Sequence, residues 1–397
     1  SPPSTAAGSR RCWRVGMRPW RGLGRLLRAE RRFGAPRSGA IPRHGAAATR
    51  PVGHDVVAFR GERATCVHGA DLMETVLNTD VKSGPPYQVF FLTGALRSGT
   101  TLLRLLLGHH SSISTCNEME FLPPLILERD LRANPSSARQ FLDLDRQFND
   151  SGFEFDPDLS VERSLIHFLD QRFALDRTPW VAATVHNDFH SLPEIWPKAR
   201  FIFLHRDPRD VARSSVNMGW AGNAWGGAQT WLSAQASLAR LQETVASDRI
   251  LELKFEDLVR EPETELGRIC TWLGLAFEPE MLAIDRDTTY SPPASGEARS
   301  WRTDAAELEI QQVEARVGRD ALVTAGYVLS EAPALDVTPL RRRWLNLCNW
   351  AGRLQQRVQR QGLVLVLAHF VADRLHIRLL KAWATQRTHA ITRSMLK

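Results

Sequence analysis

A glycine-containing loop between two apolar runs most constrains how this chain can fold. The sequence from Phe90 to Leu106 reads FFLTGALRSGTTLLRLL. The apolar run from Val89 to Leu92 suits a buried strand, and the run from Leu102 to Leu107 suits a helix. Gly94 and Gly99 bracket four residues, which is the form of a phosphate-binding loop. A strand, such a loop and a helix predict an α/β domain built on a parallel sheet.

The loop lacks the lysine of nucleotide-hydrolysing phosphate-binding loops. In the pattern GxxxxGK[ST], that lysine follows the second glycine and reaches the terminal phosphates. Here Thr100 and Thr101 follow Gly99, while Arg97 and Ser98 precede it. Backbone N–H groups and a helix N-terminus still suit an anion. We therefore expect the loop to hold a phosphate-like group with a different set of side chains.

A second candidate anion site follows further along the chain. The residues from Arg200 to Ser215 read RFIFLHRDPRDVARSS. They contain another buried-strand pattern, then Arg206, a proline-marked turn and a helix start that carries Ser214. An arginine in this place can also pair with a nearby carboxylate, such as Asp207 or Asp210. The sequence therefore predicts two anion-binding segments in one domain.

The two segments together resemble the sulfotransferases that use 3'-phosphoadenosine 5'-phosphosulfate (PAPS), and distantly the protein-tyrosine sulfotransferases. Two later blocks occur in the order of that family, namely Leu253–Leu275 and the RSWR motif at Arg299–Arg302, which an acidic helix and Gly326–Tyr327 follow. The resemblance runs from about Gln88 to Tyr327. It implies a sulfotransferase domain at 85–330 with a three-layer, P-loop-type α/β fold around a central parallel sheet.

The resemblance also implies which residues bind PAPS. The family's loop binds the 5'-phosphosulfate, and the corresponding residues here are Arg97, Ser98, Gly99, Thr100 and Thr101. In the family an arginine, with a serine eight residues later, binds the 3'-phosphate, and Arg206 and Ser214 have this spacing. Trp301 and Arg302 are further candidates for contact with the nucleotide; alternatively, Trp301 packs on the core and Arg302 is solvated.

Sulfuryl transfer resembles phosphoryl transfer, in which the protein mainly positions the reactants and stabilises charge. A base for the acceptor is implied by a glutamate that stands twenty-one residues after the loop arginine in protein-tyrosine sulfotransferases; that position is Glu118. A carboxylate can act as a base if burial raises its pKa. The alternatives are a solvated Glu118, the neighbouring Glu120, or one of the histidines, among them His186.

The chain departs from the family in one respect. Related enzymes usually supply a lysine that bridges the leaving phosphate and the sulfuryl group, but the segment Trp180–His190 contains none and has Ala183 near the aligned position. Either Arg97, Arg104 or His186 provides the positive charge, or the chain binds nucleotide with little turnover.

The two ends of the chain differ from its middle. Residues 1–54 hold twelve arginines and one acid, which predicts a disordered basic leader, or an organellar transit peptide. Residues 338–397 predict an amphipathic helical tail with a basic polar side, a helical C-terminal extension of the domain. Three readings of the tail remain open: packing on the catalytic domain, a homodimer contact, or peripheral attachment to an anionic membrane.

Hydropathy and cysteine usage give expectations about location and metals. No run of 18 apolar residues suggests a membrane span, and the five cysteines are scattered without CxxC spacing. We expect a cytoplasmic protein, with organellar import as the alternative, and no metal.

The sequence thus predicts a PAPS-dependent sulfotransferase that acts on a hydroxyl or amine. The acceptor stays open among small molecules, lipids, glycans and peptides. Two other classes compete: a noncatalytic nucleotide-binding or membrane-associated scaffold, and an ATP-dependent kinase, against which Thr100 argues because it stands in the place of the kinase lysine.

Overall fold

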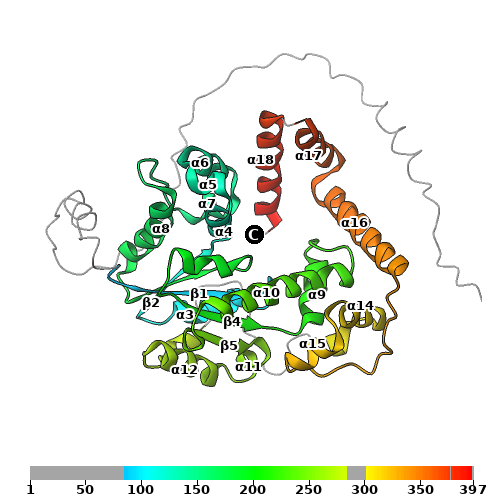
Figure 1. The fold of residues 1–397 in the computed structure, drawn as a ribbon, viewed down its shortest axis with the longest axis horizontal. Coiled ribbons are helices and arrows are strands. Elements are labelled where there is room, and N and C mark those ends of the chain that lie inside the picture. The colour runs from blue at the N-terminus through cyan, green and yellow to red at the C-terminus, as the bar shows by residue number, and fades with distance from the viewer. Residues whose placement is uncertain (1–84, 284–300, 376, 396–397) are drawn as a thin grey trace, which may run out of the picture. The chain divides into compact units, whose positions relative to one another are not determined.

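The computed structural model describes residues 85–283, 301–375 and 377–395. These residues belong to one compact unit, Thr75–Lys397 (Figure 1). The predicted leader, 1–54, lies outside the described residues.

A parallel sheet of five strands forms the centre of this unit, in the order β2-β3-β1-β4-β5. The strands are β1 (Gln88–Gly94), β2 (Ile113–Glu118), β3 (Trp180–Thr184), β4 (Arg200–His205) and β5 (Ile250–Lys254). Since β1 lies between β3 and β4, the carboxyl ends of three neighbouring strands meet around the loop that follows β1.

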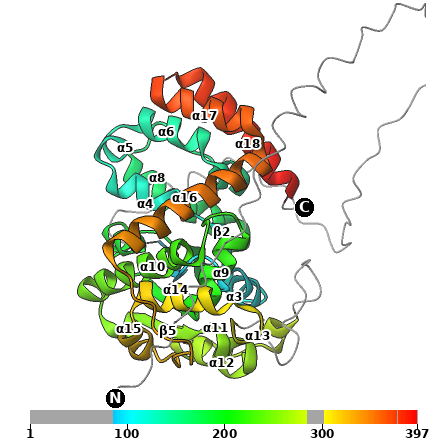
Figure 2. The same cartoon turned by 90° about the vertical axis from the view of Figure 1, so that its right-hand side faces the viewer.

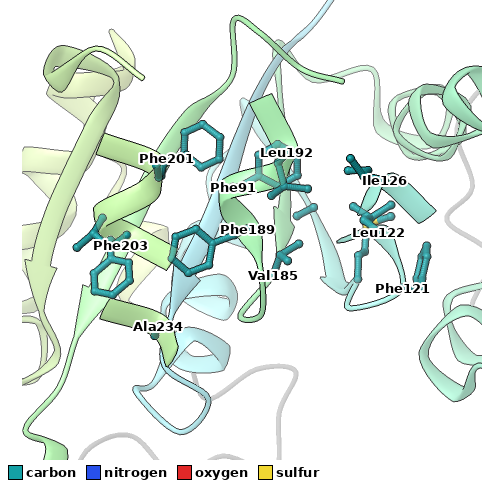
Figure 3. Packing of buried hydrophobic residues seen from close by; sticks show 14 of the residues in the cluster. Phe91, Phe121, Leu122, Ile126, Val185, Phe189, Leu192, Phe201, Phe203 and Ala234 are labelled. Atoms are coloured by element: carbon teal, nitrogen blue, oxygen red, sulfur yellow. The ribbon is translucent and has the colours of Figure 1, made fainter. Parts of the chain in front are cut away.

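Alternate side chains of the strands enter two separate cores, as the period of two in a strand requires. Phe91, Phe201 and Phe203 pack with α4 (Leu122–Leu127), α8 (Val161–Asp176) and α10 (Ala224–Thr244) on one face (Figure 3). Phe90 and Ile202 pack with α3 (Thr100–Gly108) and α12 (Pro262–Leu273) on the other. Both faces are covered, which is why the three central strands, β1, β3 and β4, are almost wholly buried. The predicted three-layer α/β fold is confirmed.

Shorter elements connect these layers. Between β2 and β3 lie α5 (Arg129–Ala133), α6 (Pro135–Leu144) and α7 (Arg146–Ser151), and α9 (Pro208–Asn217) follows β4. The remaining helices of the domain are α11 (Phe255–Arg260), α13 (Trp301–Asp304), α14 (Glu307–Val317) and α15 (Arg319–Thr324), with 3-10 turns η1 (Phe189–Glu194), η2 (Ser247–Arg249) and η3 (Pro279–Leu282).

The predicted helical C-terminal extension is confirmed as α16 (Pro339–Gln361), α17 (Leu363–Leu375) and α18 (Arg378–Met395). α16 packs on α10 and on the turn after α9, where the Arg360 guanidinium donates to the carbonyl of Asn217 at 3.0 Å. α17 and α18 lie side by side (Figure 2). The packing reading of the tail therefore holds for α16. In the part of the chain that the structure describes, no helix combines the length and hydropathy of a membrane span.

Candidate functional site

The loop after β1 has a backbone that only certain residues tolerate. Gly94 and Gly99 have φ values of 144° and 96°, and Arg97 has a φ of 75°. Gly99 forms the N-cap of α3 without a side-chain cap, and the side chain of Ser98 bonds back to the carbonyl of Ala95. The first turn of α3 thus presents N–H groups that can donate hydrogen bonds to an anion.

Thr100, at the start of α3, begins a chain of three polar side chains, of which the first two are buried. Its hydroxyl lies 2.8 Å from Nε2 of His186, which follows β3. Nδ1 of the same ring lies 2.7 Å from Oε1 of Glu120, which follows β2. The loop, the end of β3 and the end of β2 are joined by these two contacts.

Glu120 is held as a carboxylate. It accepts hydrogen bonds from the backbone N–H of His186 at 2.6 Å and from the side-chain amide of Asn187 at 2.8 Å. Burial by itself would raise the pKa of Glu120. The hydrogen bonds and charge of His186 and the backbone N–H of Asn187 outweigh burial and hold that pKa below its ordinary value. An ionised carboxylate only accepts, so Nδ1 of His186 carries a proton.

This proton leaves two states for the other ring nitrogen. If His186 is neutral, Nε2 accepts the hydrogen bond of the Thr100 hydroxyl, whose single proton is then not available to another acceptor. If His186 is protonated, Nε2 donates to Thr100, and the hydroxyl proton is available to an anion in the loop. The second state therefore offers one more hydrogen-bond donor to an anion in the loop.

The two predicted anion-binding segments lie in direct contact. Nε of Arg97 donates to the Ser214 hydroxyl at 2.9 Å, and Nη1 of Arg206 donates to the Arg97 carbonyl at 2.9 Å. The Arg206 guanidinium also lies over the ring of Phe255, 4.4 Å from its centroid. Its Nε is buried and, within the described residues, has no hydrogen-bond partner. Burial lowers the pKa of Arg206. An anion's oxygen is the partner that such a buried donor lacks.

The carboxylate that follows Arg206 is bound elsewhere. Asp207 accepts from Nη2 of Arg209 at 2.7 Å and from the indole N–H of Trp301 at 2.9 Å. Arg209 also donates to Glu314 at 2.9 Å, and its guanidinium lies 3.6 Å from the centroid of the Trp301 ring. The alternative in which Arg206 pairs with Asp207 is thus replaced by an Arg209 pair. This buried cluster fixes the turn between β4 and α9.

Trp301 and Arg302, both candidates for nucleotide contact, lie at the start of α13. Trp301 is buried against Arg209, which agrees with the packing alternative. Arg302 is exposed, with its guanidinium 5.0 Å from the centroid of the Trp301 ring. Their contact with a nucleotide stays a prediction.

Glu118, the predicted base, is the last residue of β2 and pairs in register with Thr184 of β3. Its Oε2 accepts from the side-chain amide of Gln147 at 3.0 Å. It also lines a cavity of about 390 Å³ between β2, α7 and α8. The carboxylate that contacts the loop's histidine is therefore Glu120, while Glu118 faces a cavity of its own. Sequence spacing pointed to Glu118 and carried no signal for the partners of Glu120.

The position at which related enzymes have a lysine is part of the hydrophobic core in this chain. Ala183 is fully buried among the aromatic side chains of one sheet face. Lys254, at the end of β5, donates to the Gly326 carbonyl at 3.1 Å and lies over the Tyr327 ring. The cationic groups built into the loop and its direct contacts are Arg97, Arg206 and, when protonated, His186.

No group of three or more histidine, cysteine or acidic side chains suited to a metal occurs in the described residues.

Comparison with known proteins finds a family match for the central part of the chain. A model of the sulfotransferase family matches residues 89–279. The chain is 24% identical to an uncharacterized protein of Aquifex aeolicus over 223 residues, 53% of this chain and 28% of that protein. It is also 24% identical to protein-tyrosine sulfotransferase 2 of Gallus gallus over 205 residues, 49% of this chain and 53% of the relative. The chain thus spans about half, or less, of these relatives.

Solved structures give a more distant likeness. The sulfotransferase domain from the curacin biosynthetic pathway is 19% identical, with a TM-score of 0.44, over 62% of this chain and all of that domain.

Replacing Gly99 by alanine should destabilise the loop. Gly99 has a φ of 96°, and an added Cβ would lie 2.3 Å from a ring carbon of Phe255. We expect the free energy of unfolding to fall by about 1–3 kcal/mol, as for other strained backbone positions, in urea unfolding followed by circular dichroism.

Gly267→Ala is the matched control. An added Cβ there, within α12, meets nothing within 4 Å. This variant should be neutral or more stable by up to about 1 kcal/mol, because alanine favours a helix interior. Equal stability of Gly99→Ala and the wild type would contradict the loop geometry described above.

Proposed function

Because residues 89–279 form a domain of the sulfotransferase family, we propose that this protein transfers a sulfuryl group from PAPS to a hydroxyl or amine of an acceptor. The observation that carries the proposal is the contact between the two anion-binding segments, through Arg97, Arg206 and Ser214. A donor with phosphate-like groups at both ends of a ribose needs two such sites close together.

Each end of PAPS would have its own donors. The N–H groups of Gly99 and Thr100, with the side chains of Arg97, Ser98 and Thr101, would hold the 5'-phosphosulfate. Arg206 and Ser214 would hold the 3'-phosphate, and the unpaired Nε of Arg206 suits a phosphate oxygen. No metal is needed, because the arginines supply the positive charge.

We assign the role of the missing lysine to His186. Nδ1 of His186 donates to the Glu120 carboxylate, and the ring contacts the loop through the Thr100 hydroxyl. The protonated ring frees the Thr100 hydroxyl to donate to the leaving phosphate. Glu118 would take the proton of the acceptor as its oxygen or nitrogen bonds to sulfur and the bond between sulfur and the 5'-phosphate oxygen breaks.

A second arrangement is supported by the same contacts. His186, backed by the Glu120 carboxylate, could take the acceptor's proton itself, as paired histidines and carboxylates do in other enzymes. The two arrangements differ in which carboxylate the reaction needs.

Binding of the product nucleotide tests the donor site. 3',5'-Adenosine bisphosphate at 100 times its dissociation constant should raise the free energy of unfolding by about 2.7 kcal/mol, measured by thermal unfolding. Arg206→Ala should lose this stabilisation. Arg268→Ala should keep it, since Arg268 pairs with Glu265 on the surface of α12. Stabilisation by ATP with magnesium alone would indicate a kinase instead.

Substitution of the two glutamates separates the roles. Glu118→Gln should lower the rate of transfer by about 100-fold, the usual effect of losing a general base, without changing the affinity for the bisphosphate. Glu120→Gln should weaken bisphosphate binding and transfer together, because His186 loses the carboxylate that holds its ring against Thr100. Transfer rates and isothermal titration measure the two effects.

Two outcomes would contradict these assignments. Full activity of Glu118→Gln would remove Glu118 from the mechanism and pass the role of base to His186 and Glu120. Bisphosphate binding without transfer to any acceptor, in the wild type, would favour the noncatalytic scaffold.

The C-terminal helices support a proposal about a partner. α17 exposes Leu363, Val364, Leu367, Phe370 and Val371, with between 38% and 76% of each side chain accessible. Residues 338–397 hold ten arginines and two lysines against one aspartate. Exposed apolar side chains beside arginine suit an anionic lipid surface, so we propose peripheral membrane contact rather than a homodimer.

Vesicle sedimentation tests the membrane contact. The protein should bind vesicles of phosphatidylserine with phosphatidylcholine, and bind phosphatidylcholine alone weakly. Val364→Glu with Phe370→Glu should abolish binding, since both side chains are exposed and their loss leaves the core intact. Gln355→Glu with Gln359→Glu adds the same charge at exposed positions of α16 and should change binding little. A dimer in analytical ultracentrifugation, broken by the α17 pair, would support the homodimer instead.

A further inference from the structure

A cavity of about 330 Å³ lies between the loop after β1 and the C-terminal extension. Its walls come from the loop, the segments after β3 and α9, the start of α10, the end of α14 and the middle of α16. The last two follow the part of the chain that the family model matches. The cavity is therefore shaped partly by residues that lie beyond the matched part of the chain.

One side of the cavity adjoins the groups assigned to the reaction. Leu96 precedes Arg97 in the loop, and the guanidinium of Arg97 lies 5.9 Å from the centroid of the Trp220 ring. Asn187 follows His186 and donates to Glu120 at 2.8 Å. Leu96, Trp220 and Asn187 all line the cavity. A molecule held there would adjoin both the loop and the segment that carries His186.

The helix α16 is firmly attached as the opposite wall. The indole N–H of Trp225 donates to Asn346 at 3.0 Å, and the backbone N–H of Gly222 donates to Asn349 at 2.8 Å. The backbones approach so closely that a Cβ added to Gly222 would lie 2.3 Å from the carbonyl of Asn349. Only a glycine permits this contact, so the position of α16 is set by packing.

The charged side chains of the cavity are both arginines. Arg316 lies over the Trp225 ring at 4.7 Å and donates to Gln229 at 2.7 Å, while its Nε is buried without a partner in the described residues. Arg353 of α16 is exposed at the rim. No carboxylate lines the described cavity, so both charges suit an anion.

The rest of the lining is polar. Amide and hydroxyl side chains, namely Asn187, Gln229, Thr230, Ser233, Asn346 and Asn349, alternate with the two tryptophan rings. Amides and hydroxyls both donate and accept, as the many hydroxyls of a sugar require, and an indole ring can lie against the C–H face of a sugar. An apolar lipid would offer no partner to the buried Nε of Arg316 or to the remaining donors and acceptors of this lining.

On the basis of the proposed sulfuryl transfer, we propose that α16 completes the acceptor site and that the acceptor is an acidic glycan. Its carboxylate is bound by Arg353 and Arg316, and the hydroxyl to be sulfated lies toward Leu96 and Asn187, beside the His186–Glu120 pair that serves as the base in the second arrangement above. The tail then has two parts with different tasks: α16 selects the acceptor, and α17 remains available for other contacts.

A matched pair of acceptors tests the charge requirement. The probes are a glucuronate-containing oligosaccharide and the same oligosaccharide with its carboxylates reduced to alcohols. The full chain should bind and sulfate the acidic form with at least about tenfold preference, the usual worth of a charge-assisted hydrogen bond. Arg353→Ala should raise the KM for the acidic form about tenfold or more and leave that for the reduced form unchanged. Equal use of the two forms by the wild type would overturn the proposal.

Arg357→Ala on the same helix is the control. Arg357 is exposed, one turn beyond Arg353, and does not line the cavity, so its loss should leave both KM values unchanged. Equal KM values for Arg353→Ala and Arg357→Ala would also refute the assignment. Binding of each oligosaccharide, measured by calorimetry with and without 3',5'-adenosine bisphosphate, separates the two proposals. If the bisphosphate does not bind, the donor proposal fails, while preference for the acidic oligosaccharide still decides the acceptor site.

Discussion

The central place of β1 in an all-parallel sheet is the constraint on which the site depends. β1 bonds to β3 on one side and to β4 on the other, so three strand ends open at one edge. Groups 86 and 109 residues apart in the chain thereby come within hydrogen-bond distance, as between the side chains of Thr100 and His186 and between the Arg206 guanidinium and the Arg97 carbonyl. Ligands bind at this place in open parallel sheets because the strand order reverses there and leaves a crevice.

Local chemistry made much of this arrangement predictable. The predicted strands at Val89–Leu92 and Phe201–His205 lie within β1 and β4, since apolar runs between turn signals carry their own information. The glycine loop could also be predicted from the sequence. Gly94 and Gly99 adopt backbone angles that other residues avoid, so the loop requires glycine at these two positions. Contacts between residues on different strands could not be predicted in this way. Nothing local distinguishes Glu120 from Glu118, and only the pairing of β2 with β3 brings Glu120 to His186.

The same limit explains the cluster around Asp207. The sequence showed an acid beside Arg206, and a simple ion pair was one reading. Tertiary packing instead supplies Arg209, Glu314 and the Trp301 indole, and these bonds offset the cost of burying the charges. Asp207 is thereby fully occupied, so the neighbouring Arg206 keeps a free donor. A structural ion pair thus protects the cation that the proposed chemistry needs.

The distribution of charge links the extension to the site. The leader, 1–54, and the tail, 338–397, each carry a net charge of +11, so the residues between them carry −15. An acidic domain repels an anionic acceptor, and Arg97 and Arg206 are the groups proposed to hold the donor. α16 changes the local field by placing Arg353 at the cavity's edge, across from Arg316. The basic extension is therefore better understood as part of the acceptor site than as an appendage, because the domain alone lacks the charge to attract such a substrate.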